Sequence, residues 1–234
     1  MGSFRLLNYE GAQGETRPGI LADGDAVVDL RQALPGKPWA VSTLAVLEAW
    51  NEALPALHAL ADAPQNNSRR LATVKLLAPL LYPPAIYCTG ANYMAHAEEM
   101  SAEGSGVDKT TTQPYLFLKS GPHCIIGPGA EIRLPGVSKK VDWEAECAVV
   151  IGKPGRNIKV HDAMEHVAGY TIANDYAIRD YLENWYRPNL RVKSRDGATV
   201  LGPWLVDAAD IEAPPQLALR TLVNGRQTQS GNTR

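Results

Sequence analysis

Apolar residues recur at short, regular intervals in the first part of the chain and predict a small mixed unit. Residues 4–7 and 26–30 are apolar runs of strand length. Residues 43–60 carry leucines at mostly helical spacing, which predicts a helix interrupted at Pro55. A polar stretch that follows indicates a linker. We therefore predict a small N-terminal α/β lobe and linker over residues 1–75.

The pattern changes after residue 75, where short runs of β-branched and aromatic residues alternate with Gly and Pro. These runs predict strands at residues 85–88, 115–118, 130–134 and 145–151. Asn224-Gly225, between two further runs, tolerates the positive φ angles of a tight hairpin turn. A single short helix is expected at residues 162–167. The predicted fold class is α+β and β-rich, with residues 76–234 as a second, larger domain.

Composition and charge argue against several classes of protein. The 234 residues are 45% hydrophobic and 21% charged, which is enough apolar content for a folded core. Lys and Arg number 23 against 25 Asp and Glu, so the net charge of −2 disfavours nucleic-acid binding. No apolar run approaches the roughly 18 residues that cross a bilayer, and the N-terminus lacks the apolar stretch of a secretory signal. We expect no nucleic-acid and no membrane partner.

The cysteines and the absence of common catalytic signatures exclude further classes of protein. Cys88, Cys124 and Cys147 are odd in number and contain no CxxC pair, which argues against a disulfide framework or a zinc ribbon. A reducing cytoplasm is the expected compartment. The sequence contains no GxGxxG, GxxxxGK[ST], HExxH or GxSxG, so kinase-like and dehydrogenase-like functions are disfavoured.

Two glutamates on one predicted strand are the first candidates for chemistry. Side chains alternate along a strand, so Glu144 and Glu146 project from the same face, roughly 6–7 Å apart. Two carboxylates on an otherwise apolar strand repel each other and lose hydration, and a cation between them relieves both effects. A solvated polar face near a sheet edge explains this spacing equally well.

Asp175 adds a third carboxylate at the end of another predicted strand, residues 169–174. Three carboxylates without a nearby His or Cys form a hard oxygen set, which suits Mg²⁺, Mn²⁺ or Ca²⁺ better than Zn²⁺. The alternative is that Asp175 caps a helix beginning at Tyr176.

A histidine and a lysine are candidates for acid–base chemistry. His96 and Glu99 are adjacent on a helical turn, where the carboxylate can orient the imidazole and raise its basicity. Such a pair can act as a general base through water. Lys193 can neutralise an enolate or a carboxylate. An inert surface helix and a solvated lysine are the alternatives, and spacing alone favours them.

Together these segments resemble the fumarylacetoacetate hydrolase superfamily in order and spacing, from about residue 80 to the end. The matching segments are residues 90–93 with His96 and Glu99, 117–119, 141–152, 168–175, 179–180, 193–197, 201–204 and 223–225. Residues 174–197 are especially similar to the isomerase/decarboxylase branch of homoprotocatechuate (4-hydroxyphenylacetate) breakdown. Family members continue for roughly fifty residues past the position that matches Arg234, with a segment that lines the site. Either this sequence is shortened or the protein lacks part of its barrel.

The resemblance implies a mixed β-roll with few short helices, usually assembled as a homodimer. It implies Mg²⁺ or Mn²⁺ held by the residues that match Glu144, Glu146 and Asp175. It also implies a small-molecule substrate whose 2-oxo or 2-hydroxy acid end chelates the metal.

The leading hypothesis is a metal-dependent isomerase/decarboxylase of aromatic-acid catabolism that acts on a 2-oxo/2-hydroxy di- or tricarboxylate. Its catalytic residues would be His96, Glu99 and Lys193. Three arginines could donate to a distal carboxylate of the substrate through their forked guanidinium groups: Arg179, Arg187 and Arg191. Alternatively, any of them could simply pair with surface acids. The alternatives are a C–C bond hydrolase of an acylpyruvate or fumarylacetoacetate-type substrate, and a non-catalytic metal-binding relative.

Overall fold

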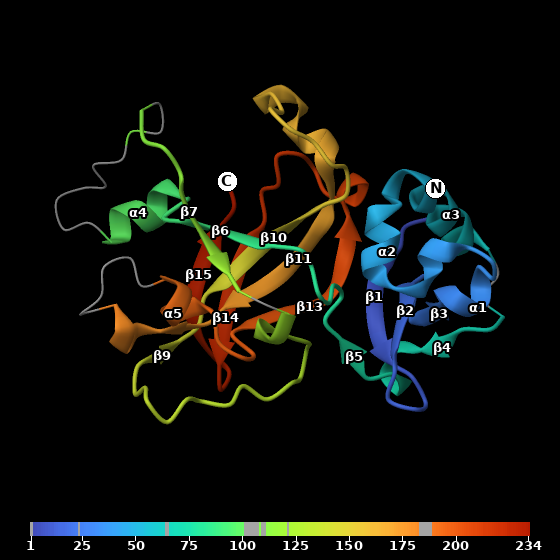
Figure 1. Ribbon diagram of the computed structural model, residues 1–234, viewed down its shortest axis with the longest axis horizontal. Helices are drawn as coiled ribbons and strands as arrows, with labels where there is room; N and C mark the ends of the chain where they lie inside the picture. Colours follow the sequence, from blue (N-terminus) through green and yellow to red (C-terminus); the bar gives the residue numbers. More distant parts are fainter. Residues whose placement is uncertain are drawn as a thin grey trace.

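The computed structural model describes residues 2–22, 24–63, 66–100, 108, 111–120, 122–182 and 189–234. Figure 1 shows a strand-rich molecule with few helices, which confirms the predicted fold class. None of the helices in these ranges is both long and apolar enough to cross a membrane.

One mixed sheet joins the N-terminal strands to strands from the rest of the chain. Its strands, in spatial order, are β10 (Ala145–Ile151), β11 (Val167–Asp175), β13 (Thr199–Asp207), β1 (Arg5–Glu10), β2 (Thr16–Leu21), β3 (Ala26–Asp29) and β4 (Arg69–Arg70). In addition, β5 (Leu76–Leu77) pairs with β1, and β8 (Ile125–Ile126) pairs in parallel with β13. Because β1 pairs with β13, the predicted lobe and the rest of the chain share this sheet. The division at residue 75 stays a prediction.

Three strand pairs lie outside the main sheet. They are β6 (Ile86–Gly90) with β7 (Tyr115–Lys119), β9 (Val141–Asp142) with β12 (Ala177–Ile178), and β14 (Ala218–Val223) with β15 (Arg226–Asn232). In the turn between β14 and β15, Asn224 and Gly225 have φ angles of 51° and 78°, as the hairpin signal predicts.

The helices gather at the two ends of the molecule. They are α1 (Leu30–Ala33), α2 (Thr43–Glu48), α3 (Trp50–Asp62), α4 (Met94–Met100) and α5 (Asn189–Lys193). Short 3₁₀ helices are η1 (Pro38–Val41), η2 (Leu71–Thr73), η3 (Pro122–Cys124), η4 (Val160–His166), η5 (Arg179–Tyr181) and η6 (Ala208–Asp210). In Figure 1, α1, α2 and α3 lie beside β1–β3, whereas α4 and α5 lie at the opposite end.

The largest core cluster packs β1 and β2 against α2 and α3. Its buried members include Phe4, Leu6, Ile20, Val46, Trp50 and Leu57. A smaller cluster underlies the ends of β11 and β13, and its buried members are Ala78, Cys124, Ile125, Ala173 and Leu201. This second cluster supports the strand ends that carry the predicted acids.

The predicted helix break at Pro55 is wrong. The helical stretch breaks at Ala49, between α2 and α3, and Pro55 lies inside α3. Since α3 buries Trp50 and Leu57 against the sheet, packing outweighs the single backbone hydrogen bond that a proline removes.

The predicted strand at residues 130–134 is also wrong, because these residues have no strand conformation. They follow a turn in which Gly129 has a φ angle of 72°. Ile132 packs against Tyr176 and its neighbours, whereas Leu134 is 67% exposed. The apolar pattern there reflects isolated packing contacts and not a strand ladder.

Close approach of β11 to β13 requires a glycine at position 169. A Cβ atom on Gly169 would lie 2.0 Å from the carbonyl oxygen of Val206. The register of this strand pair also shifts between Tyr170 and Ile172, which is a local irregularity of the ladder. No side chain fits at Gly169 unless one of the two backbones moves.

We predict that Gly169→Ala lowers the free energy of unfolding by about 1–3 kcal/mol or more, as overpacking does in other cores. Urea denaturation followed by circular dichroism measures the change. Gly136→Ala is the matched control, because an added Cβ there meets nothing within 4 Å. Equal midpoints for the two variants would contradict the prediction.

Candidate metal and acid–base site

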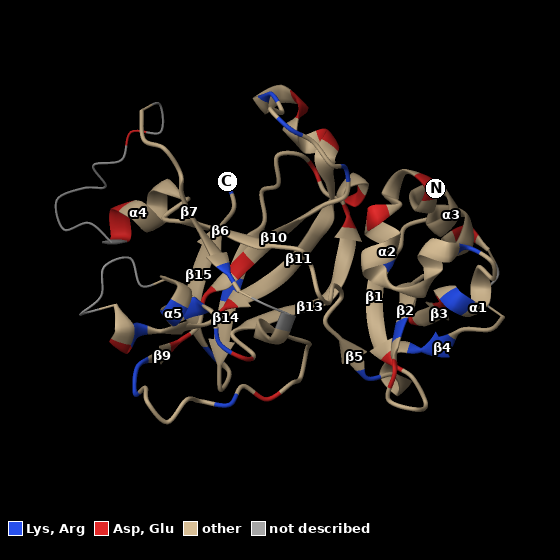
Figure 2. Ribbon diagram, in the orientation of Figure 1, with Lys and Arg blue, Asp and Glu red and all other residues tan. Residues whose placement is uncertain are grey.

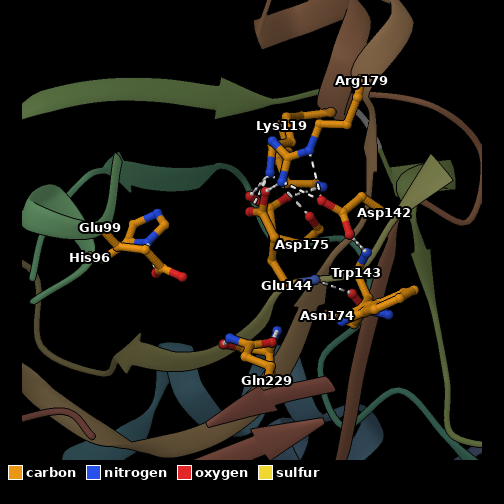
Figure 3. A network of polar contacts seen from close by, with 12 residues as sticks. His96, Glu99, Lys119, Asp142, Trp143, Glu144, Asn174, Asp175, Arg179 and Gln229 are labelled. Carbon is orange, nitrogen blue, oxygen red and sulfur yellow. Dashed lines mark hydrogen bonds and ion pairs between the residues drawn. The ribbon is translucent and has the colours of Figure 1, made fainter. Parts of the chain in front are cut away.

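The three predicted acids come together at one end of the β10–β11 pair. Glu144 directly precedes β10, and Glu146 lies opposite Ala173 of β11. Asp175 ends β11, and its backbone N–H donates to the carbonyl oxygen of Glu144 at 2.9 Å. The antiparallel register therefore places the three carboxylates near one another, as Figure 3 shows for Glu144 and Asp175.

Two buried lysines neutralise these acids. Lys193, at the end of α5, donates to the Glu144 carboxylate, to Asp175 Oδ2 at 2.9 Å and to the Asp175 carbonyl oxygen at 3.1 Å. Lys119, at the end of β7, donates to Asp175 Oδ1 and to the carbonyl oxygen of Ala198 at 2.8 Å. Lys119 is only 4% exposed and Lys193 only 6%, so their ion pairs are shielded from water. Figure 2 shows basic and acidic segments meeting beside β10 and α5.

Arg179 adds a third cation. Its Nε atom donates to Asp142 Oδ2 at 2.9 Å, and its Nη2 atom donates to the Glu144 carboxylate. Burial alone would lower the pKa of Arg179, but the charges of Glu144 and Asp142 outweigh burial and raise it. The guanidinium is thus engaged by acids, and its expected contact with a substrate carboxylate stays a prediction.

Glu146 differs electrostatically from the other two acids. Burial, together with the negative charges of Glu144 and Asp175, raises the pKa of Glu146 from its ordinary value of 4.5 to about 7. Lys193 and His96 act in the opposite direction but do not cancel the shift. Burial is the largest cause, and the two neighbouring acids add to it, so the ionised form of Glu146 is disfavoured in the metal-free protein.

The donor set fits a hard divalent cation in chemistry and in charge. All three side chains offer carboxylate oxygens, and the raised pKa of Glu146 shows where additional positive charge would be favourable. Within the described ranges, however, no group of three or more His, Cys, Asp or Glu side chains is already arranged around an ion position. Oxygens of Glu144 and Asp175 are instead turned toward Lys193. An ion and this lysine would compete for the same atoms.

The predicted His96–Glu99 pair forms on α4. His96 Nδ1 lies 3.4 Å from Glu99 Oε2, and their side chains are 56% and 81% exposed, respectively. In Figure 3, His96 and Glu99 lie to one side of Asp175 and Glu144, with no dashed contact to them. His96 is nevertheless near enough to contribute to the electrostatic environment of Glu146. Its role as a base stays a prediction.

The other two predicted arginines are Arg191 and Arg187. The guanidinium carbon of Arg191, on α5, lies 4.9 Å from the ring centre of Tyr181, a cation–π contact. Arg187 lies outside the described residues. The expected grouping of the three arginines around a substrate carboxylate stays a prediction.

Sequence reasoning missed four residues that shape the site. Lys119 contacts Asp175, and Asn174 accepts from the backbone of Glu144. Asp142 accepts from Arg179, and Gln229 bonds the backbone of Ala145, between the two glutamates. A lysine that ends the apolar strand Tyr115–Lys119 is a usable signal, because a buried lysine needs a partner. Gln229 gives no such signal, because its contacts with the acid-bearing strand are to Ala145, 84 positions away.

A thiol also lies near the acids without being activated. Burial and the negative charge of Asp175 raise the pKa of Cys88 to about 12. The thiolate form, which is the nucleophile, is therefore disfavoured at Cys88.

Residues 85–234 match the family described as fumarylacetoacetate (FAA) hydrolase C-terminal. The chain belongs to this fumarylacetoacetate hydrolase family. The match includes every acid and cation of the candidate site, together with His96 and Glu99.

Two relatives of this chain are named for different activities. The 4-hydroxyphenylacetate degradation bifunctional isomerase/decarboxylase of Salmonella dublin is 45% identical over 155 residues, which is 66% of this chain and 34% of that protein. The mitochondrial oxaloacetate tautomerase fahd2 of Xenopus laevis is 37% identical over 234 residues, covering 99% of this chain and 70% of that protein. The chain thus matches about a third of the length of the bacterial relative.

Solved structures of family members share the fold. Fumarylacetoacetate hydrolase from Exiguobacterium antarcticum has a TM-score of 0.77 and 32% identity, covering 99% of this chain and 76% of that chain. Maleylpyruvate hydrolase from Sphingobium sp. SYK-6, in complex with manganese (II) ion and pyruvate, has a TM-score of 0.74 and 25% identity. That comparison covers 98% of this chain and 76% of that chain.

The raised pKa of Glu146 predicts a pH-dependent stability of the metal-free protein. Between about pH 4.5 and pH 7, folded protein holds a proton that the unfolded chain has released, so stability falls as the pH rises. Glu146→Gln removes this loss, so the variant gains stability relative to wild type from about pH 5 to about pH 8.

Urea midpoints of both proteins in chelator-treated buffer measure this gain. If the difference in urea midpoint between Glu146→Gln and wild type were the same at about pH 5 and about pH 8, the raised pKa of Glu146 would be contradicted.

Proposed function

We propose that this chain is a divalent-metal-dependent enzyme of aromatic-acid catabolism, an isomerase/decarboxylase of 2-oxo or 2-hydroxy di- or tricarboxylates. The observation that carries the proposal is the cluster of Glu144, Glu146 and Asp175, in which the pKa of Glu146 is raised. The names of the Salmonella relative and of the manganese–pyruvate complex support it. Because the chain matches only 34% of the Salmonella protein, the activity of that protein is proposed for this chain and not transferred.

Glu144, Glu146 and Asp175 would hold the ion through oxygen atoms, which favours Mg²⁺ or Mn²⁺ and also permits Ca²⁺. When bound, such an ion supplies Lewis acidity to the carboxylate and the 2-oxygen of an α-keto acid. The homodimer that the family resemblance implies stays a prediction.

Lys193 would change partners when substrate binds. An ammonium group has three N–H donors, and here all three are directed to Glu144 and Asp175. The carboxylate contacts of Lys193 are given up once another cation neutralises these two acids. Lys193, which is itself buried, can then donate to the oxygen on which negative charge develops.

His96 would act as the proton-transferring group. Its Nδ1 atom faces Glu99, which leaves Nε2 to exchange a proton with substrate or water. The exposure of His96 gives it access to substrate that enters from solvent. Isomerisation requires such a base to move a proton along the substrate, whereas loss of CO₂ does not require one at the same position.

Tautomerisation of oxaloacetate is a second candidate function, and one observation favours it. The Xenopus oxaloacetate tautomerase matches 99% of this chain, considerably more than the Salmonella protein does. This reaction also moves a proton next to a 2-oxo acid group. C–C bond hydrolysis, with His96 and Glu99 activating water, is the remaining alternative on the same residues, and the maleylpyruvate hydrolase structure is its precedent.

We predict that Glu146→Gln weakens Mn²⁺ binding by more than about 100-fold, since outer partners of metal ligands alone typically account for 10- to 100-fold. Turnover should fall by orders of magnitude while the fold is retained. Isothermal titration with Mn²⁺ and assays on oxaloacetate, 2-hydroxyhepta-2,4-dienedioate and an acylpyruvate measure both effects.

Glu165→Gln is the matched control, because Glu165 is an exposed acid on η4 that pairs with Lys153. Wild-type activity should disappear with a chelator and return with Mn²⁺. If Glu146→Gln kept the wild-type affinity and rate, the metal role would be refuted.

His96→Ala separates the candidate reactions. We expect a loss of about 10²- to 10⁴-fold in isomerisation, tautomerisation or hydrolysis, which is the usual contribution of a general base. The loss in decarboxylation should be smaller. Product analysis by NMR distinguishes CO₂ release, a shifted double bond and C–C cleavage. An unchanged rate on every substrate would exclude His96 as the base.

A further inference from the structure

The start of β10 lies at the edge of the main sheet. β10 ends the strand order, and on its inner side it pairs with β11. Glu144 faces that side: its carbonyl oxygen accepts from Asp175 N at 2.9 Å, and its N–H donates to Asn174 Oδ1 at 3.1 Å. Successive residues of a strand direct their backbone groups to opposite sides, so Ala145 faces outward. Its N–H and C=O need partners from outside the sheet.

Gln229 supplies both partners. Its Oε1 atom accepts from Ala145 N at 2.8 Å, and its Nε2 atom donates to Ala145 O at 3.1 Å. The carboxamide therefore replaces one peptide group of a neighbouring strand. Thr221, across the β14–β15 hairpin, donates from Oγ1 to the same Oε1 atom at 2.8 Å and fixes the amide orientation.

Ala145 is the residue between Glu144 and Glu146. A displacement of its backbone moves both carboxylates at once, and their positions relative to Asp175 change with it. Figure 3 shows Gln229 beside this strand, on the opposite side of Glu144 from the lysine contacts. The C-terminal hairpin thus acts on the acid cluster through one side chain.

We propose that Gln229 is a positioning residue of the candidate metal site. Its amide fixes the outer edge of β10 at Ala145 and thereby holds Glu144 and Glu146 in place for the ion. This inference rests on the proposed metal role of the acids. Gln229 itself contacts backbone and not the ion, so it acts through the strand.

Gln229→Met tests the inference, because methionine has a similar length and lacks the amide. We expect the dissociation constant for Mn²⁺ to rise about 10- to 100-fold, the usual effect of losing a partner that orients a ligand. Thr221→Val, which removes only the orienting hydroxyl, should shift it less and in the same direction. Gln227→Met, an exposed position on the same strand, is the matched control and should bind as wild type does.

Titrations are run at a temperature well below the metal-free unfolding midpoint of each variant, so that a loss of overall stability does not alter the dissociation constant. If wild type binds Mn²⁺ and Gln229→Met binds it with the same affinity, the role of Gln229 is overturned while the proposed metal site stands. Wild type that does not bind Mn²⁺ overturns the proposed function and this inference with it. If Gln229→Met does not fold, Thr221→Val decides, and an unchanged affinity there overturns the inference.

Discussion

Mutual repulsion among three carboxylates is the constraint on which the site depends. Pairing of β10 with β11 places Glu144, Glu146 and Asp175 at one strand end, partly shielded from water. Buried charges of one sign are costly unless cations and hydrogen bonds compensate them. Lys119, Lys193 and Arg179 provide this compensation from three different elements, β7, α5 and η5. The charge cluster therefore ties segments that are far apart in sequence to the edge of the main sheet.

Glu146 is the exception: burial, together with the charges of Glu144 and Asp175, raises its pKa to about 7. A site neutralised fully by lysine and arginine would be structural, whereas one that leaves a carboxyl with a raised pKa can take up another cation. The family supports more than one reaction on this scaffold, as the names of its isomerase/decarboxylase, tautomerase and hydrolase members show. Fold alone does not select among these reactions. The proposed function assigns that selection to the groups around the acids, with His96 as the proposed base.

Local patterns in the sequence were sufficient to predict the acids but not their partners. Period-two alternation predicts Glu144 and Glu146 on one face of a strand. In the structure Glu144 directly precedes β10, and its charge contributes to the raised pKa of Glu146. The run before Asp175 forms β11, which ends in that acid. Helical spacing likewise predicts the His96–Glu99 contact. The pairing of Lys119 with Asp175, across 56 positions, and that of Gln229 with Ala145, across 84, depend on tertiary structure. The two wrong elements, at Pro55 and residues 130–134, fail because packing overrode local preference.

Diffraction from crystals soaked in Mn²⁺ and oxalate, an unreactive analogue of a 2-oxo acid, tests the central claim most directly. Anomalous scattering at the manganese edge locates the ion without reference to any expected position. The account predicts one strong peak within about 2.0–2.3 Å of oxygens from Glu144, Glu146 and Asp175, with Lys193 withdrawn from at least one of these acids. Manganese bound elsewhere, with Lys193 still joining Glu144 to Asp175, would contradict it.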